Sequence, residues 1–497
     1  MLKMLRILVR NKARINPGKC IFVQTERTYS EKGISKRVVQ KGNGLNLSLD
    51  NVKNNLESIK NILLPYKDDD ELMPWIDRTP EVPPHADVVI IGGGVIGSSI
   101  AYWLKKRVFK DMKVVVVERD PTYTKASTVL SAGGLRQQFS LEENIEMSLF
   151  GAEFIRNIND YLGIDGQPPI DPYFHPYGYL MLGTEKGAEQ LIQNSRLQNF
   201  LGAKNVLLTP SKLELMFPWL NVNDISLGCL GLEKEGWFDP WSLLCAFKKK
   251  ALVLGAEYVY AEAKGFTYKK NVNSAPHARL NELVVETPEG ETKTIKFALG
   301  VVAAGPFSGD VASLVKLDTP EGVQGIFLPV EPRKRYVYCF HCPEGPGLNT
   351  PLTIDYTGTY FRREGLAGTY ICGRSPPESE EPPTTDLSVD HEYFNEKIWP
   401  ELANRVKSFD KLKVKSAWAG YYEYNTFDQN GIIGIHPYHR NLFFATGFSG
   451  HGIQQAPAVG RAISELIVDG KYVTIDLTSL GYQRILSDKP VFEANIV

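Results

Sequence analysis

Three glycines and one acidic residue have the types and spacing of a dinucleotide-binding site. Gly92, Gly94 and Gly97 form a G-x-G-x-x-G motif, and Glu118 follows downstream. The first glycine would allow a tight turn, and the second would let the backbone approach a pyrophosphate. The third would let a helix pack closely on a strand, and Glu118 would accept hydrogen bonds from ribose hydroxyls.

These residues need a strand, a helix and a second strand to hold them, and the sequence predicts all three. The apolar run 87–91 is too short for a helix and is bounded by glycines, which is typical of a buried strand. Residues 98–107 have the pattern of a helix, and 113–118 form a second apolar run that ends in Glu118. The phosphates would lie at the positive end of the helix. The complete unit predicts dinucleotide binding far more strongly than the glycines alone.

Two later stretches repeat the same pattern and indicate which dinucleotide binds. Residues 296–308 and 441–467 each read as a buried strand, a glycine turn and the start of a helix. An NAD domain that is complete in itself would finish its sheet soon after the first motif. Three returns from distant parts of the sequence instead suggest one large cofactor enclosed by a discontinuous domain, which favours FAD.

Motifs along most of the chain resemble those of the FAD-dependent amine and D-amino-acid oxidoreductases, the superfamily of D-amino-acid oxidase, sarcosine oxidase, glycine oxidase and dimethylglycine dehydrogenase. They are, in family order, DVVIIGGGVIGSSIAYWL, VVVVERD, AST…SAGGL, EGWFDPWSL, VVAAGPFS, WAGYYEYNTFDQNGIIG and ATGFSGHGIQQAPAVGRAI. The resemblance implies an α/β fold with a discontinuous Rossmann-type FAD-binding domain and an antiparallel-sheet substrate domain. The implied FAD-binding domain takes 85–170, 239–322 and 430–475, the substrate-like domain takes 171–238 and 323–429, and 476–497 form a C-terminal tail.

The resemblance also implies which residues contact FAD. Ser127 and Thr128 match small polar residues near the FAD phosphates, with a helix N-cap as the alternative. Gly305 would let the backbone approach the flavin chain, and the turn around His451 would face the flavin ring, where a helix N-terminus stabilises negative charge. A purely structural turn and a structural histidine are the alternatives. The expected cofactor residues are Gly92, Gly94, Val95, Ile96, Gly97, Glu118, Arg119, Ser127, Thr128, Ala263, Ala304, Gly305, Gly447, Gly450, His451, Gly452 and Ile453.

A second set of residues is expected on the substrate side. The run TYFRREG matches a family strand that presents an aromatic residue and often an arginine to the substrate, and an arginine there could hold a carboxylate bidentately. A surface salt bridge is the alternative. The candidates for catalysis are Arg136, Tyr360, Arg362 and His451. Four aromatic residues could wall an amine pocket or belong to the core, namely Trp418, Tyr421, Tyr422 and Tyr424.

The chain departs from its relatives at positions that decide the chemistry. Tyr421 stands where some relatives attach the flavin to a cysteine, and ASTVLSAGGL lacks the linking histidine of others, so FAD is expected to be non-covalent. Ile371 replaces the lysine that promotes reaction with oxygen in the oxidases, which favours a dehydrogenase. Gln454 replaces a lysine that binds the substrate carboxylate. The lone CxxC of Cys339 and Cys342 is read as structural, and no metal site is expected.

The N-terminus and the overall composition predict a location. Residues 1–25 carry six basic residues and no acidic one, and RTYS at 27–30 resembles a processing site. We therefore expect a mitochondrial transit peptide over 1–29 and an extension over 30–84 with a helix near 52–64; a disordered basic tail is the alternative. The formal charge of −1 gives no reason to expect nucleic-acid binding. Long apolar runs are absent, so association with the inner membrane is expected to be peripheral at most.

Further runs carry a closer resemblance, to a branch of the superfamily known for the assembly of respiratory complex I in mitochondria. These are GWFDPW, LPVEPRKRYVY, YFRREGL, SAWAGYY, YNTFDQNG and FATGFSGHG. The resemblance implies a matrix protein whose partners are complex I subunits or assembly intermediates. An enzyme that oxidises a small amine and passes electrons to a protein acceptor is the second hypothesis, and an NAD enzyme is a distant third.

Overall fold

The structure is a computed structural model, and it describes residues 81–269, 279–319, 322–325 and 327–494. All of these belong to one compact unit, Pro74–Val497. The predicted transit peptide, the processing site and the helix near 52–64 lie outside the described residues. No helix in the described part of the chain is both long and apolar enough to cross a membrane.

A mostly parallel sheet forms around the strands predicted first. Its central order is β19-β20-β11-β1-β2-β8, and all neighbours are parallel except β19 and β20. The bounds are β1 His85–Ile91, β2 Val114–Glu118, β8 Glu257–Tyr260, β11 Thr292–Val302, β19 Ile432–Ile435 and β20 Leu442–Thr446. The antiparallel strands β9 (Glu262–Lys269) and β10 (Arg279–Glu286) extend β11. Since the central strands are covered on both faces, they are almost continuously apolar.

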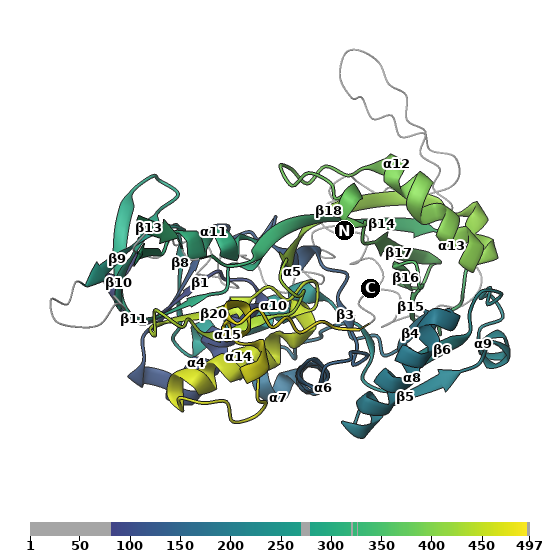
Figure 1. Ribbon diagram of the computed structural model, residues 1–497, viewed down its shortest axis with the longest axis horizontal. Coiled ribbons are helices and arrows are strands. Elements are labelled where there is room, and N and C mark those ends of the chain that lie inside the picture. Colours follow the sequence, from purple (N-terminus) through teal and green to yellow (C-terminus); the bar gives the residue numbers. More distant parts are fainter. Residues whose placement is uncertain (1–80, 270–278, 320–321, 326, 495–497) are drawn as a thin grey trace, which may run out of the picture. The chain divides into compact units, whose positions relative to one another are not determined.

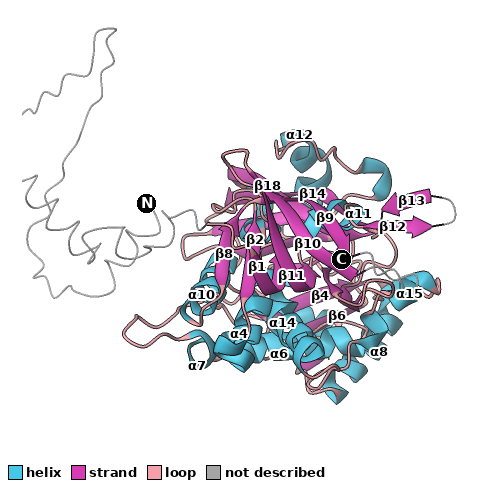
Figure 2. Ribbon diagram, turned by 90° about the vertical axis from the view of Figure 1, so that its left-hand side faces the viewer, coloured by secondary structure: helices cyan, strands magenta, loops and turns pink. Residues whose placement is uncertain are grey.

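Helices cover one face of this sheet, as Figure 2 shows. They are α4 (Val95–Val108), α6 (Glu142–Arg156), α10 (Pro240–Val253) and α14 (Gly452–Val468), and α4 contacts both α10 and α14. Their apolar faces and the sheet form one large core cluster that includes Ile90, Leu104 and Phe247. The predicted strands at 87–91 and 113–118 and the predicted helix at 98–107 are confirmed as β1, β2 and the body of α4.

A second sheet holds the strands that the sequence places outside the FAD-binding domain. Its order is β18-β14-β17-β16-β15-β4-β6-β5, and every pair is antiparallel except β15 with β4. The bounds are β4 Tyr179–Gly183, β5 Asn205–Leu208, β6 Leu227–Gly231, β14 Val330–His341, β15 Leu352–Ile354, β16 Thr359–Arg363, β17 Thr369–Arg374 and β18 Lys413–Asn425. Helix α13 (Trp399–Arg405) packs on the β14–β17 end of this sheet (Figure 1).

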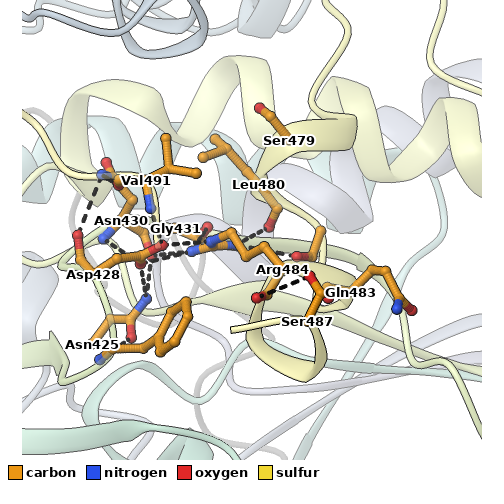
Figure 3. A network of polar contacts seen from close by, with 12 residues as sticks. Asn425, Asp428, Asn430, Gly431, Ser479, Leu480, Gln483, Arg484, Ser487 and Val491 are labelled. Atoms are coloured by element: carbon orange, nitrogen blue, oxygen red, sulfur yellow. Dashed lines mark hydrogen bonds and ion pairs between the residues drawn. The ribbon is translucent and has the colours of Figure 1, made fainter. Parts of the chain in front are cut away.

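The C-terminal residues bind to the rest of the fold through Arg484 and Glu493, and we call these contacts the C-terminal clasp. Arg484, in the short helix α15 (Gln483–Leu486), makes a bidentate ion pair with the buried Asp428, with Nε–Oδ2 at 2.6 Å and Nη2–Oδ1 at 2.9 Å (Figure 3). The Glu493 carboxylate accepts hydrogen bonds from the Ser140 hydroxyl at 2.6 Å and from Asn144 Nδ2 at 2.7 Å. The last described residues thereby hold the turn after β18 and the segment that precedes α6.

Candidate FAD site

The carboxyl ends of the parallel strands β1, β2 and β11 meet at one edge of the first sheet, where open α/β sheets bind their ligands. A cavity of about 600 Å³ lies there, and residues of the second sheet complete its wall. Of the seventeen expected cofactor residues, the cavity wall includes Gly92, Gly94, Val95, Ile96, Glu118, Arg119, Ser127, Thr128, Ala263, Ala304, Gly305, Gly450, His451, Gly452 and Ile453. Gly97 and Gly447 do not line the cavity.

The glycine motif builds a close contact between β1, α4 and β11. Gly92 has a φ of +105°, and a Cβ there would lie 2.3 Å from the carbonyl oxygen of Ala303. A Cβ on Gly97 would lie 1.9 Å from the carbonyl oxygen of Gly92. Gly94 is the N-cap of α4 and contributes no side chain, so nothing of its own covers the positive end of the helix. The motif leaves room for a phosphate at that end.

Glu118 holds the glycine loop as well as facing the cavity. Its Oε2 accepts a hydrogen bond from the backbone N–H of Gly93 at 2.7 Å, and its Oε1 accepts one from Asp120 at 2.9 Å. Burial raises the pKa of Glu118. Its neighbour Arg119 places its guanidinium 3.9 Å from the ring centre of Phe307. Both residues lie at the end of β2, where a ribose hydroxyl can reach the Glu118 carboxylate.

Neither Ser127 nor Thr128 is the N-cap of the helix that follows, because Ala126 is the N-cap of the short helix α5 (Ser127–Leu130). Thr128 Oγ1 instead accepts a hydrogen bond from the backbone N–H of Val95, at 3.2 Å. Ser127 Oγ is buried and has no hydrogen-bond partner in the protein. An unsatisfied buried hydroxyl costs about 1–3 kcal/mol, which a phosphate oxygen in the cavity would offset. This unpartnered hydroxyl and the bare glycine cradle both fit the phosphates of FAD.

Arg136 and His451 form one buried unit in the wall of the cavity. Arg136 Nη2 lies 3.1 Å from His451 Nε2. Burial, and then the neighbouring guanidinium, lower the pKa of His451 to about 3, so the imidazole is neutral and accepts the hydrogen bond on Nε2. Burial also lowers the pKa of Arg136. No acidic side chain of the described residues makes an ion pair with Arg136, so its charge is available to an anion in the cavity.

Arg362 does not reach the cavity, although the sequence suggests it for the substrate side. Its Nε and Nη2 donate to the carbonyl oxygen of Ala132 at 3.1 and 2.9 Å, and its Nη1 donates to Glu364 at 2.8 Å. These bonds occupy the guanidinium, so Arg362 ties β16 to the segment after α5. Tyr360, two residues earlier on β16, lines the cavity.

The four aromatic candidates divide between cavity and structure. Tyr421 and Tyr422 line the cavity. Trp418 does not, since its Nε1 donates to the carbonyl oxygen of Leu130 at 3.0 Å, and Tyr424 lies under the guanidinium of Arg333. The hydroxyl of Tyr421 donates to the carbonyl oxygen of Thr384 at 3.2 Å.

Two features of the cavity are absent from the sequence prediction. Glu423 of β18 lines the cavity, and its Oε2 accepts hydrogen bonds from the Thr446 hydroxyl and from the backbone N–H of Gly447, both at 3.1 Å. Arg335 also lines the cavity and makes a two-pronged ion pair with Glu381, at 2.7 and 2.8 Å. An acidic residue inside the apolar and aromatic run AWAGYYEYN is the signal that points to Glu423.

Of the remaining residues that the sequence singles out, Gln454 lines the cavity and the others do not. Ile371 and Cys372 are buried in β17, and neither lines the cavity. Cys339 belongs to β14 and Cys342 follows it, and both are free thiols. The amide oxygen of Gln454 accepts a hydrogen bond from the backbone N–H of Arg136 at 2.7 Å, so this side chain holds the arginine segment against α14.

Comparison with known proteins agrees with this geometry. The family model for FAD dependent oxidoreductases matches residues 87–466. FAD-dependent oxidoreductase domain-containing protein 1 of Xenopus laevis is 53% identical over 85% of this chain and 88% of its own length, and the Drosophila melanogaster homolog is 46% identical over 83% and 81%. The crystal structure of L-proline dehydrogenase from P. horikoshii is similar with a TM-score of 0.68 and 26% identity, covering 82% of this chain and all of that one. The chain therefore belongs to the FAD dependent oxidoreductase family, and its cofactor is FAD.

Proposed function

We propose that this flavoprotein acts in the mitochondrial matrix, at the matrix face of the inner membrane, in the assembly of respiratory complex I. Its partners are complex I subunits or assembly intermediates, and its contact with the membrane is peripheral. The observation that carries the proposal is the closer sequence resemblance, in runs that span both sheets, to the branch with that role. The basic, acid-free stretch 1–25 supports the mitochondrial address.

The sequence supports a redox role that does not depend on oxygen. FAD, when bound, supplies the acceptance of a hydride from a donor and its later release as electrons. The residue in place of the lysine of the oxidases is Ile371, which is buried in β17 and does not face the cavity. The chain therefore keeps the cofactor cradle without a lysine at the position where the resemblance places one in the oxidases.

Removal and replacement of the chain in cells tests the assembly role. Loss of the chain is expected to lower fully assembled complex I on native gels while complexes III and IV stay at normal levels, and the wild-type chain should restore it. Expression of Gly97→Ala in the same cells shows whether complex I assembly needs the intact cofactor cradle. Gly187→Ala, which adds the same methyl group outside the cradle, is the matched control. Normal complex I without the chain, or localisation outside mitochondria, would contradict the proposal.

Arg136 favours a second function, the dehydrogenation of a small amine that carries an anionic group. Its buried guanidinium has no acidic partner among the described residues and faces the cavity beside neutral His451. Hydrogen bonds to charged groups contribute about 1.5–3 kcal/mol, enough to orient a carboxylate. Anaerobic addition of secondary and tertiary amines, with and without a carboxylate, tests this function. Bleaching of the visible flavin band by the carboxylated amines alone would support it, and an unbleached band across the panel would refute it.

A further inference from the structure

Glu423 connects the two sheets at the cavity. It belongs to β18 of the second sheet, but its carboxylate binds Thr446 and Gly447, at the end of β20 in the first sheet. Its Oε1 lies 3.2 Å from where a Cβ on Gly452 would be, and its Oε2 lies 3.9 Å from the same point on Gly305. The carboxylate thus stands between two of the glycine turns that form the cofactor cradle.

The charge of this carboxylate is solvated by neutral donors only. These are the Thr446 hydroxyl and the backbone N–H groups of Gly447 and Phe448. Glu423 makes no ion pair with any lysine or arginine in the part of the chain that the structure describes. The side chain is partly exposed, and it lines the cavity that FAD fits. Cofactor binding would remove that last contact with water, so the carboxylate would respond directly to charge that develops in the cavity.

Charged groups on the neighbouring elements are already engaged or neutral. Lys334 of β14 lies on the same face of the second sheet and pairs with Asp386 at 3.4 Å. Arg119 is stacked on Phe307, and His451 is neutral because its pKa is lowered to about 3. Asp310, in the first turn of α11 (Ser308–Ser313), also lines the cavity and adds negative charge.

The cations of Arg335 and Arg136 line the cavity as well. Arg335 is paired with Glu381 at 2.7 and 2.8 Å, and Arg136 Nη2 lies 3.1 Å from His451 Nε2. Neither arginine makes an ion pair with Glu423, so no cation of the described residues holds this carboxylate ionised by direct contact.

We propose that Glu423 takes up one proton from water when the bound FAD is reduced, and so couples proton uptake to the redox state of the cofactor. Reduction brings two electrons and one proton to the cofactor, as a hydride from a donor or from dithionite and water. The cavity then holds one more negative charge, and the Glu423 carboxylate binds one further proton, which balances it. Reoxidation releases that proton to water. Like charges at close range disfavour each other in a buried site, and the Glu423 carboxylate has no paired cation, so it is the group that we expect to bind the proton.

Burial supports this role, because it raises the pKa of Glu423 to about 7 and so places proton binding in the physiological range. An acceptor held by hydroxyl and backbone donors keeps its position in both charge states. The proposal requires only that FAD be bound and reducible, and it holds whether or not the chain turns over an amine.

The test is the pH dependence of the FAD reduction potential in the purified holoprotein. As the pH rises above about 7, where Glu423 is ionised in the oxidised protein, wild type is expected to take up as much as one more proton per two electrons than Glu423→Gln. The extra proton changes the equilibrium constant for FAD reduction by a further factor of ten per pH unit. For a two-electron couple, this steepens the fall of the reduction potential with pH by about 30 mV per pH unit. Glu235→Gln is the matched control, because burial also raises the pKa of Glu235 to about 7 but its side chain does not line the cavity. The control is expected to retain the wild-type slope.

A second measurement needs no variant. The infrared difference spectrum between reduced and oxidised wild type should show a protonated carboxyl band that appears on reduction and shifts in deuterium oxide. Parallel pH profiles for wild type and Glu423→Gln, or no carboxyl band in the wild-type spectrum, would overturn the proposal. An equal change of slope in Glu235→Gln would also overturn it, because the effect would then not come from the cavity.

Discussion

Gly97→Ala is the substitution for which the structure gives the sharpest expectation. The new Cβ would lie 1.9 Å from the Gly92 carbonyl oxygen, so α4 has to move away from β1 by roughly 1.5 Å to restore an ordinary contact. The helix cannot move freely, because α10 and α14 pack on it and a Cβ on Gly460 of α14 would already lie 2.2 Å from Ser99 Oγ. Overpacking of this kind costs about 1–3 kcal/mol.

The cost of Gly97→Ala should appear mainly in the binding of FAD. The displaced helix carries Gly94 and Val95, which line the cavity at the cradle, so we expect FAD affinity to fall roughly ten- to hundredfold. Flavin fluorescence during titration of the apoprotein measures the affinity, and thermal unfolding followed by circular dichroism reports the fold. Gly187→Ala is the control, since this glycine lies in α8 (Glu185–Phe200) and its added Cβ would meet nothing within 4 Å. If folded Gly97→Ala binds FAD as tightly as Gly187→Ala does, the close packing of α4 on β1 does not position the cofactor.

Three further predictions follow from buried polar groups. Arg484→Met leaves Asp428 buried without its partner and should lower the free energy of unfolding by about 3–5 kcal/mol in urea, whereas a loss below 1 kcal/mol would show that the clasp is dispensable. Arg136→Gln should weaken acetate binding, seen as a shift of the flavin spectrum, by roughly ten- to hundredfold while FAD affinity is kept; unchanged acetate affinity would place the anion elsewhere. The pKa of Glu235 is raised to about 7, so between about pH 4.5 and 7 the folded state binds more protons at this residue than the unfolded state does. The contribution of Glu235 to the free energy of unfolding is therefore lost as the pH rises through this range. Glu235→Gln should remove up to about 3 kcal/mol of this loss, and identical stability profiles for the two proteins would contradict the burial of that charge.

The parts of the site that a short stretch of chain determines could be predicted from the sequence. Gly92, Gly94 and Gly97 belong to one strand–loop–helix unit, whose geometry follows from the glycine spacing and the apolar runs on either side. The later returns to the sheet could be predicted for the same reason, because β11 and β20 are each a buried run followed by a glycine turn.

The parts that depend on side-chain reach could not be predicted. Tyr360 and Arg362 are two residues apart and therefore lie on the same face of β16. The longer side chain of Arg362 binds the Ala132 carbonyl oxygen and does not line the cavity. The place of Arg335 at the cavity cannot be predicted because it depends on how β14 and β18 pair far from the glycine motif. The place of Glu423 cannot be predicted because its partners, Thr446 and Gly447, lie at the end of a strand of the other sheet.

The amount and attachment of FAD in the purified full chain tests the reading of the cavity most directly. The chain is precipitated with acid, and the precipitate is separated from the supernatant. The flavin in each fraction is then measured by absorbance and fluorescence. We expect about one FAD per chain, all of it in the supernatant, because Tyr421 stands in place of the linking cysteine and the segment around Ser127 contains no histidine. Flavin that remains with the precipitated chain, or a folded chain that neither carries nor binds FAD, would contradict it.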